Sequence, residues 1–299
     1  MQQLFLGIDG GGSKSKAVLT TAERHILGEG VAGPGNPSHG FKQATTSIVE
    51  SALLAIESAG LTNKISLNNI IVGAGLAGVN IPQMFDEISA WQHPFKQLYL
   101  TTDPLIACLG AHQGCDGAII IIGTGSCGFS YVNGEVFTVG GHGFPQGDKA
   151  SGAWFGLQAV QQVLLSLDRL IPTSVMNELL LNKLQCGNAI ALVDATTNYC
   201  ATDYARLAHI VFDAAAQEDK QAQALINEGA NYIDAMATLL FEQGGSRLSL
   251  IGGLVSSIQP WFSQALQNKI LTPQMPPELG GVLFAQQQHA INAEAKSFK

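Results

Sequence analysis

Short apolar runs separated by glycine-rich or polar turns dominate the first half of the chain. The runs Leu4–Ile8, Ala17–Leu19 and Ile26–Val31 each predict one strand, and too few residues lie between them for a helix. Beyond a loop rich in glycine and proline, longer segments predict helices and further apolar runs predict strands. The expected elements are a helix over Gly40–Ala59, a strand over Asn69–Gly75, a helix over Pro82–Ala90, a strand over Gln97–Thr101 and a helix over Asp103–His112.

The pattern of three strands begins again near residue 118. We expect strands over Ala118–Ile122, Gly128–Tyr131 and Glu135–Val139, and the Asn-Gly pair between the last two is a strong hairpin signal. From residue 152 to about 241 the sequence is mostly helical; a strand over Arg247–Ile251 and a final helix over about Gly280–Ala293 follow. The recurrence predicts an internal structural repeat of two related half-domains.

Each half contains a glycine-rich turn directly after its first strand. Glycine tolerates positive φ and close approach of the backbone to a ligand, so successive N–H groups can converge on an anion. Two such turns that close on one polyphosphate predict an ATP-dependent phosphotransferase. The residues expected to hold the nucleotide are Gly10, Gly11, Gly12, Ser13 and Lys14 in the first half and Gly123, Thr124, Gly125 and Ser126 in the second.

Two commoner phosphate-binding motifs do not fit the first turn. The Walker A loop and the GxGxxG dinucleotide fingerprint both open a helix, whereas an extended run follows this turn. Gly7 and Gly12 have the Walker spacing, but Ser13 stands at the lysine position and Lys14 comes one residue late. An ordinary tight turn is the alternative interpretation of this turn taken alone.

The composition excludes some classes of binding partner and favours one cellular compartment. The chain has 299 residues, near the length at which a single core stops growing, so we expect two domains. Its net charge of −8 argues against a nucleic-acid or anionic-membrane partner, since each needs a basic face. Five cysteines without a CxxC pair favour a reducing compartment. With no basic leader and no apolar run near ~20 residues, we expect a cytoplasmic protein with no membrane partner.

Two aspartates stand at the ends of predicted strands. Asp9 lies beside the first turn, where its carboxylate can hold Mg²⁺ directly or through water; the alternative is an Asx residue that caps the turn. Asp103 lies between a strand and a helix, and Pro104 directly after it supports a helix N-cap.

Five short motifs are spread over nearly the whole chain, and Gly147–Gly156 adds a further distinctive run. Their order and spacing resemble the actin, hsp70 and sugar-kinase superfamily. In detail they are similar to the BadF/BadG/BcrA/BcrD ATPase family, with its N-acetylglucosamine kinases and bacterial glucosamine kinases. The five motifs are Ile8–Lys14, Thr101–Pro104, Ile122–Ser126, Gly140–Asp148 and Ile251–Leu254.

The resemblance implies an α/β fold of two ribonuclease H-like (actin-like ATPase) domains with a cleft between them. The domains would cover 1–113 and 114–299, with a helical insertion at about 152–245 and a final helix that can pack back on the first domain. The implied activity is ATP- and Mg²⁺-dependent phosphorylation of the 6-hydroxyl of N-acetylglucosamine or glucosamine. Relatives are often dimers, so a homodimer is expected.

The resemblance also implies roles for particular residues. Asp103 would be the general base for a sugar hydroxyl, and Gly252 and Gly253 would form the adenosine motif. Close strand–helix packing is the alternative for the glycine pair. Without the resemblance, Asn36 would be a loop residue and Asp148 a helix cap. The implied sugar contacts are Asn36, Asp103, Thr124, Gly125 and Asp148.

The sequence leaves open the effect of one departure from the family pattern, and it leaves open two alternative functions. Lys149 stands where many relatives have a carboxylate, so it changes the charge near the sugar if it faces the site. An iron–sulfur activator of a 2-hydroxyacyl-CoA dehydratase needs clustered thiolates, and the cysteines here are scattered. A non-catalytic sugar sensor is the third class, although both glycine turns, Asp9 and Asp103 are intact.

Overall fold

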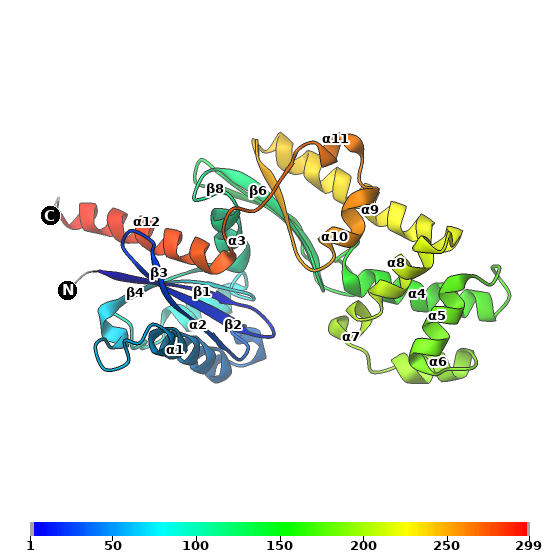
Figure 1. Cartoon of the computed structure of the whole chain (residues 1–299), viewed down its shortest axis with the longest axis horizontal. Coiled ribbons are helices and arrows are strands. Elements are labelled where there is room, and N and C mark those ends of the chain that lie inside the picture. Colours follow the sequence, from blue (N-terminus) through cyan, green and yellow to red (C-terminus); the bar gives the residue numbers. More distant parts are fainter. Residues whose placement is uncertain (1–2, 298–299) are drawn as a thin grey trace. The chain divides into compact units, whose positions relative to one another are not determined.

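The computed structural model describes residues 3–297, which form two compact α/β units (Figure 1). The first unit combines the chain up to Gly117 with the residues from Thr272 onward, and the second consists of Ala118–Leu271. Each unit is built on one five-stranded sheet.

The sheet of the first unit has the strand order β3-β2-β1-β4-β5. Strand β1 runs antiparallel to β2 and parallel to β4, which is parallel to β5. The bounds are β1 Leu4–Gly10, β2 Ser15–Thr21, β3 Ile26–Ala32, β4 Ile70–Leu76 and β5 Gln97–Thr102. The helices are α1 Phe41–Ser58, α2 Pro82–Ser89, α3 Asp103–Ala111 and α12 Pro277–Ser297, with 3-10 turns at Pro37–His39 and Leu67–Asn69.

Alternate residues of β1 face opposite layers of this unit, as the two-residue period of a strand requires. Leu6 and Ile8 belong to a core cluster that includes Ile48 of α1. Phe5 instead packs with Val282 of α12. The helices α1 and α12 therefore cover opposite faces of the sheet (Figure 1).

Helix α12 docks at distances that only glycine permits. A Cβ on Gly7 of β1 would overlap the carbonyl oxygen of Glu278, and a Cβ on Gly280 would overlap that of Ile106 in α3. The Glu278 side chain, only 4% exposed, also pairs with Lys16 of β2 at 2.6 Å. The C-terminal helix is therefore held against β1, β2 and α3 by close backbone contacts and a largely buried ion pair.

This packing changes the domain limits from those expected. The predicted domains were 1–113 and 114–299, whereas the observed first unit includes residues 114–117 and the whole segment from Thr272. The boundary was placed where the three-strand pattern begins again, and α12 lies beyond it although it completes one face of the first sheet. The resemblance had implied that the final helix can pack back on the first domain.

The second unit has the strand order β10-β9-β6-β7-β8 and carries most of the helices. Its longest helix, α9, contacts β7 and β8, and its core includes the fully buried Phe155 of α4. The strands are β6 Gly117–Ile122, β7 Ser126–Val132, β8 Glu135–Gly140, β9 Leu248–Ile251 and β10 Ile270–Leu271. The helices are α4 Gly152–Leu167, α5 Val175–Leu184, α6 Ala189–Thr196, α7 Ala201–Ala205, α8 Ala208–Ala216, α9 Lys220–Glu242, α10 Val255–Ile258 and α11 Gln264–Gln267, with a 3-10 turn at Gln259–Trp261.

The predicted repeat of three strands is confirmed, because β1–β3 and β6–β8 follow the same order in the two sheets. The short β10 and the short helices between residues 255 and 267 were not predicted, since they are too short to show a period. Within residues 3–297, none of the helices combines the length and the apolar character that crossing a membrane requires.

Candidate functional site

In the first unit, the glycine turn after β1 is fixed by three backbone hydrogen bonds. Gly11 N–H donates to Lys14 O at 2.9 Å, Gly35 N–H donates to Gly11 O at 2.9 Å, and Ala77 N–H donates to Gly10 O at 2.9 Å. The Gly11 N–H is therefore engaged within the turn and does not supply the phosphate donor expected of it.

Among the glycines of this turn, Gly10 permits a close approach, whereas a Cβ on Gly11 or Gly12 would find room. Among the described residues, the glycines with positive φ do not include Gly10, Gly11 or Gly12. A Cβ on Gly35, in the loop packed against this turn, would lie 2.7 Å from the Gly10 Cα, and a Cβ on Gly10 would overlap Leu76 Cδ2. Within residues 3–297, the amides of the exposed Gly12 and Ser13 form no hydrogen bond and remain available to an anion.

Two carboxylates lie at the carboxyl edge of the parallel strands of this sheet. Asp9 on β1 is in register with Gly75 on β4, and Gly75 is in register with Thr101 on β5, two residues before Asp103. The N-cap of α3 is Thr102, so Asp103 occupies the first helical position and its interpretation as the cap is wrong.

The electrostatics of this edge disfavour ionisation of both groups. Burial, followed by the negative charges of Asp103 and Glu278, raises the pKa of Asp9 from 3.8 to about 6, while Lys14 and Lys16 oppose the shift. Burial likewise raises the pKa of Asp103 from 3.8 to about 6, against a hydrogen bond from its own backbone. Two carboxylates with raised pKa values at one edge of a sheet are typical of a site that binds a cation or moves a proton.

Asn36 lies at the same edge, in the loop after β3. Its Oδ1 accepts hydrogen bonds from Ser38 N–H at 2.9 Å and from Ser38 Oγ–H at 2.7 Å. Gly78, which follows β4, packs so closely on this side chain that a Cβ there would overlap Asn36 Oδ1. With Oδ1 occupied, Nδ2 is the group of Asn36 that can donate to a ligand.

In the second unit, the turn between β6 and β7 is fastened to the start of α4. Gly152 N–H donates to Gly123 O at 2.7 Å and Ala153 N–H donates to Thr124 O at 3.2 Å. The first amides of α4 are therefore used within the protein. This arrangement holds the backbone of the turn rigid between a strand and a helix.

The two glycines after β9 differ in their surroundings: Gly252 is tightly packed, and Gly253 borders open space. Gly252 has φ 124° and lies against the Ile122 carbonyl oxygen, so a side chain there is excluded. Leu254 N–H donates to the same carbonyl at 3.1 Å. No atom lies within 4 Å of a Cβ built on Gly253, or on Gly123 of the turn. These two glycines leave room for a ligand beside bare backbone.

Gly123, Thr124 and Gly253 line one cavity of about 460 Å³ in this unit. The volume lies within the range of small-molecule sites. The other lining residues are Gly152, Ala205, Ala208, His209, Phe212, Asp213, Leu254 and Ser257. The cavity thus brings the second glycine turn together with Gly253 of the predicted adenosine motif. The lining residues from α7 and α8 were not predicted from the sequence.

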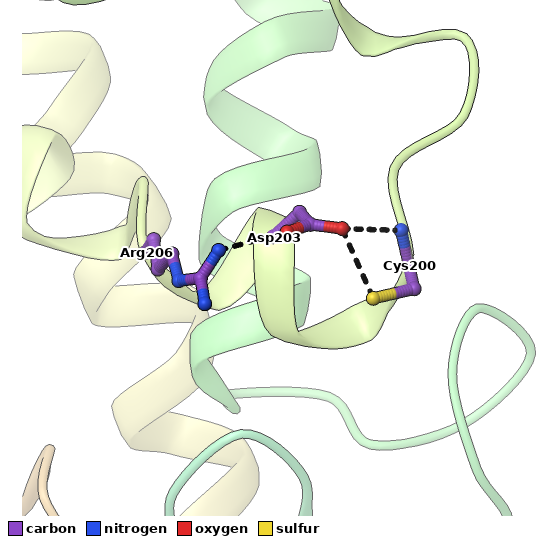
Figure 2. A network of polar contacts seen from close by, with 3 residues as sticks. All are labelled: Cys200, Asp203 and Arg206. Carbon is purple, nitrogen blue, oxygen red and sulfur yellow. Dashed lines mark hydrogen bonds and ion pairs between the residues drawn. The ribbon is translucent and has the colours of Figure 1, made fainter.

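Helix α7, which borders this cavity, is capped by a local polar network shown in Figure 2. Asp203 Oδ2 accepts hydrogen bonds from Cys200 N–H at 3.1 Å and Cys200 Sγ–H at 3.0 Å, and Asp203 Oδ1 pairs with Arg206 Nη1 at 3.0 Å (Figure 2). The Arg206 carbonyl lies 2.8 Å from Nδ1 of His209, a cavity residue. The network fixes both ends of α7, the helix that contributes Ala205.

Asp148 stands beside the same glycine turn. A Cβ on Gly125 would lie 2.7 Å from Asp148 Oδ2, and Asp148 Oδ1 accepts a hydrogen bond from Gly143 N–H at 3.3 Å. Burial raises the pKa of Asp148, while N–H groups of Gly143 and Ser126 and the nearby His142 oppose the shift. Ser151 caps α4, so the interpretation of Asp148 as the helix cap is wrong.

Comparison with families of known proteins identifies the class. A model of the BadF/BadG/BcrA/BcrD ATPase family matches residues 6–285. The chain belongs to this family.

Individual proteins named as amino-sugar kinases are similar over most of this chain. A glucosamine kinase of Vibrio cholerae is 33% identical over 94% of this chain and 95% of its own. An N-acetylmuramic acid/N-acetylglucosamine kinase of Clostridium acetobutylicum is 24% identical over 87% of this chain and 88% of its own. The crystal structure of a protein described as an N-acetylglucosamine kinase, from Chromobacterium violaceum, aligns with a TM-score of 0.87 at 29% identity, over 95% of this chain and 99% of that one.

This BadF/BadG/BcrA/BcrD ATPase has no preassembled metal cage in the part of the chain that the structure describes. No group of three or more His, Cys, Asp or Glu side chains in residues 3–297 has an arrangement that can hold a metal ion. Asp9 is the predicted metal residue, and Mg²⁺ is typically held by one or two carboxylates together with phosphates and water. The donor set therefore fits a cation that arrives with a nucleotide.

Proposed function

We propose that this protein is an ATP-dependent amino-sugar kinase that phosphorylates the 6-hydroxyl of N-acetylglucosamine or glucosamine. The observation that carries the proposal is the position of the second glycine turn. Its residues Gly123 and Thr124 line the cavity that includes Gly253, and its Gly125 lies against the Asp148 carboxylate. One backbone turn thus borders both a nucleoside-sized cavity and an acidic group suited to sugar hydroxyls.

The residues present fit ATP and Mg²⁺. The adenosine would occupy the cavity beside Gly253, where missing side chains leave space. The phosphates would meet amides of the two turns, including those of Gly12 and Ser13, and Asp9 would hold the cation. Bound MgATP supplies the phosphoryl group and neutralises its charge.

The chain's own chemical contribution is to position the acceptor and take up its proton. With a pKa of about 6, Asp103 is mostly ionised at neutral pH and is a stronger base than an ordinary aspartate. Its carboxylate would accept the proton of the sugar hydroxyl. Asn36 Nδ2 and the Asp148 carboxylate would hydrogen-bond other sugar groups and so fix which hydroxyl faces Asp103.

We expect Asp148→Ala to raise the KM for the sugar by about tenfold to a hundredfold, because it removes a charged hydrogen-bond acceptor. The KM for ATP should change little. Steady-state kinetics with each substrate varied in turn measure both values. Asp168→Ala, at an exposed aspartate of the same unit, is the matched control. An unchanged sugar KM in Asp148→Ala would show that the sugar binds elsewhere.

A coupled ADP-release assay across glucosamine, N-acetylglucosamine, glucose and N-acetylmannosamine tests the proposed function. We expect ADP release that depends on an amino sugar and prefers glucosamine or N-acetylglucosamine. Sugar binding without ADP release would instead favour a non-catalytic sensor. Rapid ADP release without any sugar would favour an ATPase of another role. A cytoplasmic location and a homodimer belong to the same proposal, and light scattering tests the dimer.

A further inference from the structure

The loop that carries Asp148 has an unusual backbone. Asp148 and Ala150 have φ values of 59° and 67°, the left-handed region, although neither is glycine. Such residues persist only where the surrounding structure holds them. The Ala150 side chain is completely buried, and a Cβ on Gly229 of α9 would lie 3.2 Å from the Ala150 Cβ.

Lys149, between these two residues, is tied to three elements. Its Nζ pairs with Glu228 Oε1 of α9 at 2.8 Å and lies 5.8 Å from the ring centroid of Trp154 in α4. Its carbonyl accepts a hydrogen bond from Ser126 Oγ–H of β7 at 2.6 Å. The side chain of Lys149 is thus engaged with α9 and α4, and its backbone with the glycine turn.

The exposure of the Lys149–Glu228 pair limits what it can do for the whole fold. The two side chains are 40% and 52% exposed, and ion pairs at such sites contribute little to global stability. The pair does, however, join α9 to the residue directly after Asp148. Its effect should therefore appear in the geometry of the loop rather than in the melting temperature.

We propose that the Lys149–Glu228 ion pair is a positioning device that holds the Asp148 carboxylate beside Gly125. This inference rests on the proposed function, in which Asp148 contacts the sugar. Lys149 acts through Asp148 and does not itself touch the sugar. The lysine that departs from the family pattern thus has a local partner of opposite charge. Tyr232, one turn after Glu228 on α9, belongs to the same electrostatic group: burial raises its pKa, the Asp148 charge adds to the shift and Lys149 opposes it.

Three variants test the inference. Lys149→Met keeps an unbranched apolar chain near Trp154, and Glu228→Gln removes only the opposing charge. The double variant Lys149→Glu/Glu228→Lys restores an ion pair in reverse. We expect each single change to raise the sugar KM by about twofold to fivefold, the most that an exposed ion pair can contribute, with kcat, the KM for ATP and the melting temperature nearly unchanged. The double swap should recover most of the sugar affinity. Lys220→Met, at an exposed lysine of α9, is the matched control.

Amide hydrogen exchange over residues 143–151 provides a second readout that needs no activity. The inference predicts faster exchange in both single variants and recovery in the double swap. A raised KM in Lys149→Met with an unchanged KM in Glu228→Gln would mean that Lys149 contacts the sugar itself, which overturns the inference. Unchanged exchange in both single variants also overturns it. If the wild-type protein phosphorylates no amino sugar, the proposed function fails. The exchange data still test whether the Lys149–Glu228 ion pair holds the loop of Asp148.

Discussion

Asp103→Asn is expected to lower kcat by about 10²- to 10⁴-fold, the usual contribution of a general base. The amide has nearly the same shape but cannot accept the proton of the sugar hydroxyl. The KM for the sugar should stay within about threefold, since the hydrogen-bonding positions remain. Steady-state kinetics at pH 7.5 measure both parameters, with Asp86→Asn, an exposed aspartate of the same unit, as control. Turnover close to that of the wild type would remove Asp103 as the base.

The same substitution should stabilise the fold at neutral pH. The pKa of Asp103 is raised from 3.8 to about 6, so the folded protein binds this proton more tightly than the unfolded chain. The free energy of unfolding therefore falls as pH rises from about 4 to about 6 and stays lower above that range. Asparagine does not ionise, so it avoids this loss of folding stability, which is at most about 3 kcal/mol for a pKa shift of this size.

Thermal melting at two pH values checks whether the Asp103→Asn substitution stabilises the fold at neutral pH. At pH 7.5 the Asp103→Asn variant should melt several degrees above the wild type, while at pH 4 the two should nearly coincide. A variant that melts lower at pH 7.5 would show that the carboxylate stabilises the fold, contrary to its raised pKa.

The second large effect is expected at the contact between α12 and α3. Gly280→Ala should destabilise the protein by about 3 kcal/mol, because the new Cβ would overlap the Ile106 carbonyl oxygen and lie 2.6 Å from Gly110 N. Both are backbone atoms of α3, so relief requires a shift of the whole helix. Since α3 begins at Asp103, turnover should fall as well.

Gly187→Ala is the control for this prediction, because no atom lies within 4 Å of a Cβ built at Gly187. The readouts are the melting temperature and kcat. Alanine is the better helix former, by about 1 kcal/mol, so a purely local effect would stabilise α12. A variant as stable as the wild type would mean that α12 and α3 are less closely packed than described.

The strands could be predicted because their signal is local. The three-strand pattern appears in the sequence as apolar runs between turns, and it recurs in both sheets. The local pattern does not predict the position of α12; only the family resemblance implied that the final helix can pack back on the first domain. That position depends on Gly7 and Gly280 meeting backbone atoms far along the chain, and a lone glycine in a sequence does not indicate which contact it permits.

The site was predictable to a similar extent. Asp9 and Asp103 were expected from their positions at strand ends, and Asn36 from the family resemblance alone; the structure of the first unit brings the three to one edge of its sheet. His209 and Phe212 were missed, because the face of a helix that borders a cavity is decided by tertiary packing. The partner of Lys149 was likewise hidden, since Glu228 lies on a distant helix.

We propose above that the protein transfers a phosphoryl group from ATP to the 6-hydroxyl of an amino sugar. Proton–phosphorus correlation NMR of the product, after incubation with ATP, Mg²⁺ and glucosamine or N-acetylglucosamine, tests it directly. We predict phosphorus coupled to the two protons on carbon 6, and no product from the 6-deoxy sugar. Phosphorus coupled to the proton on carbon 1, or inorganic phosphate alone, would contradict the claim.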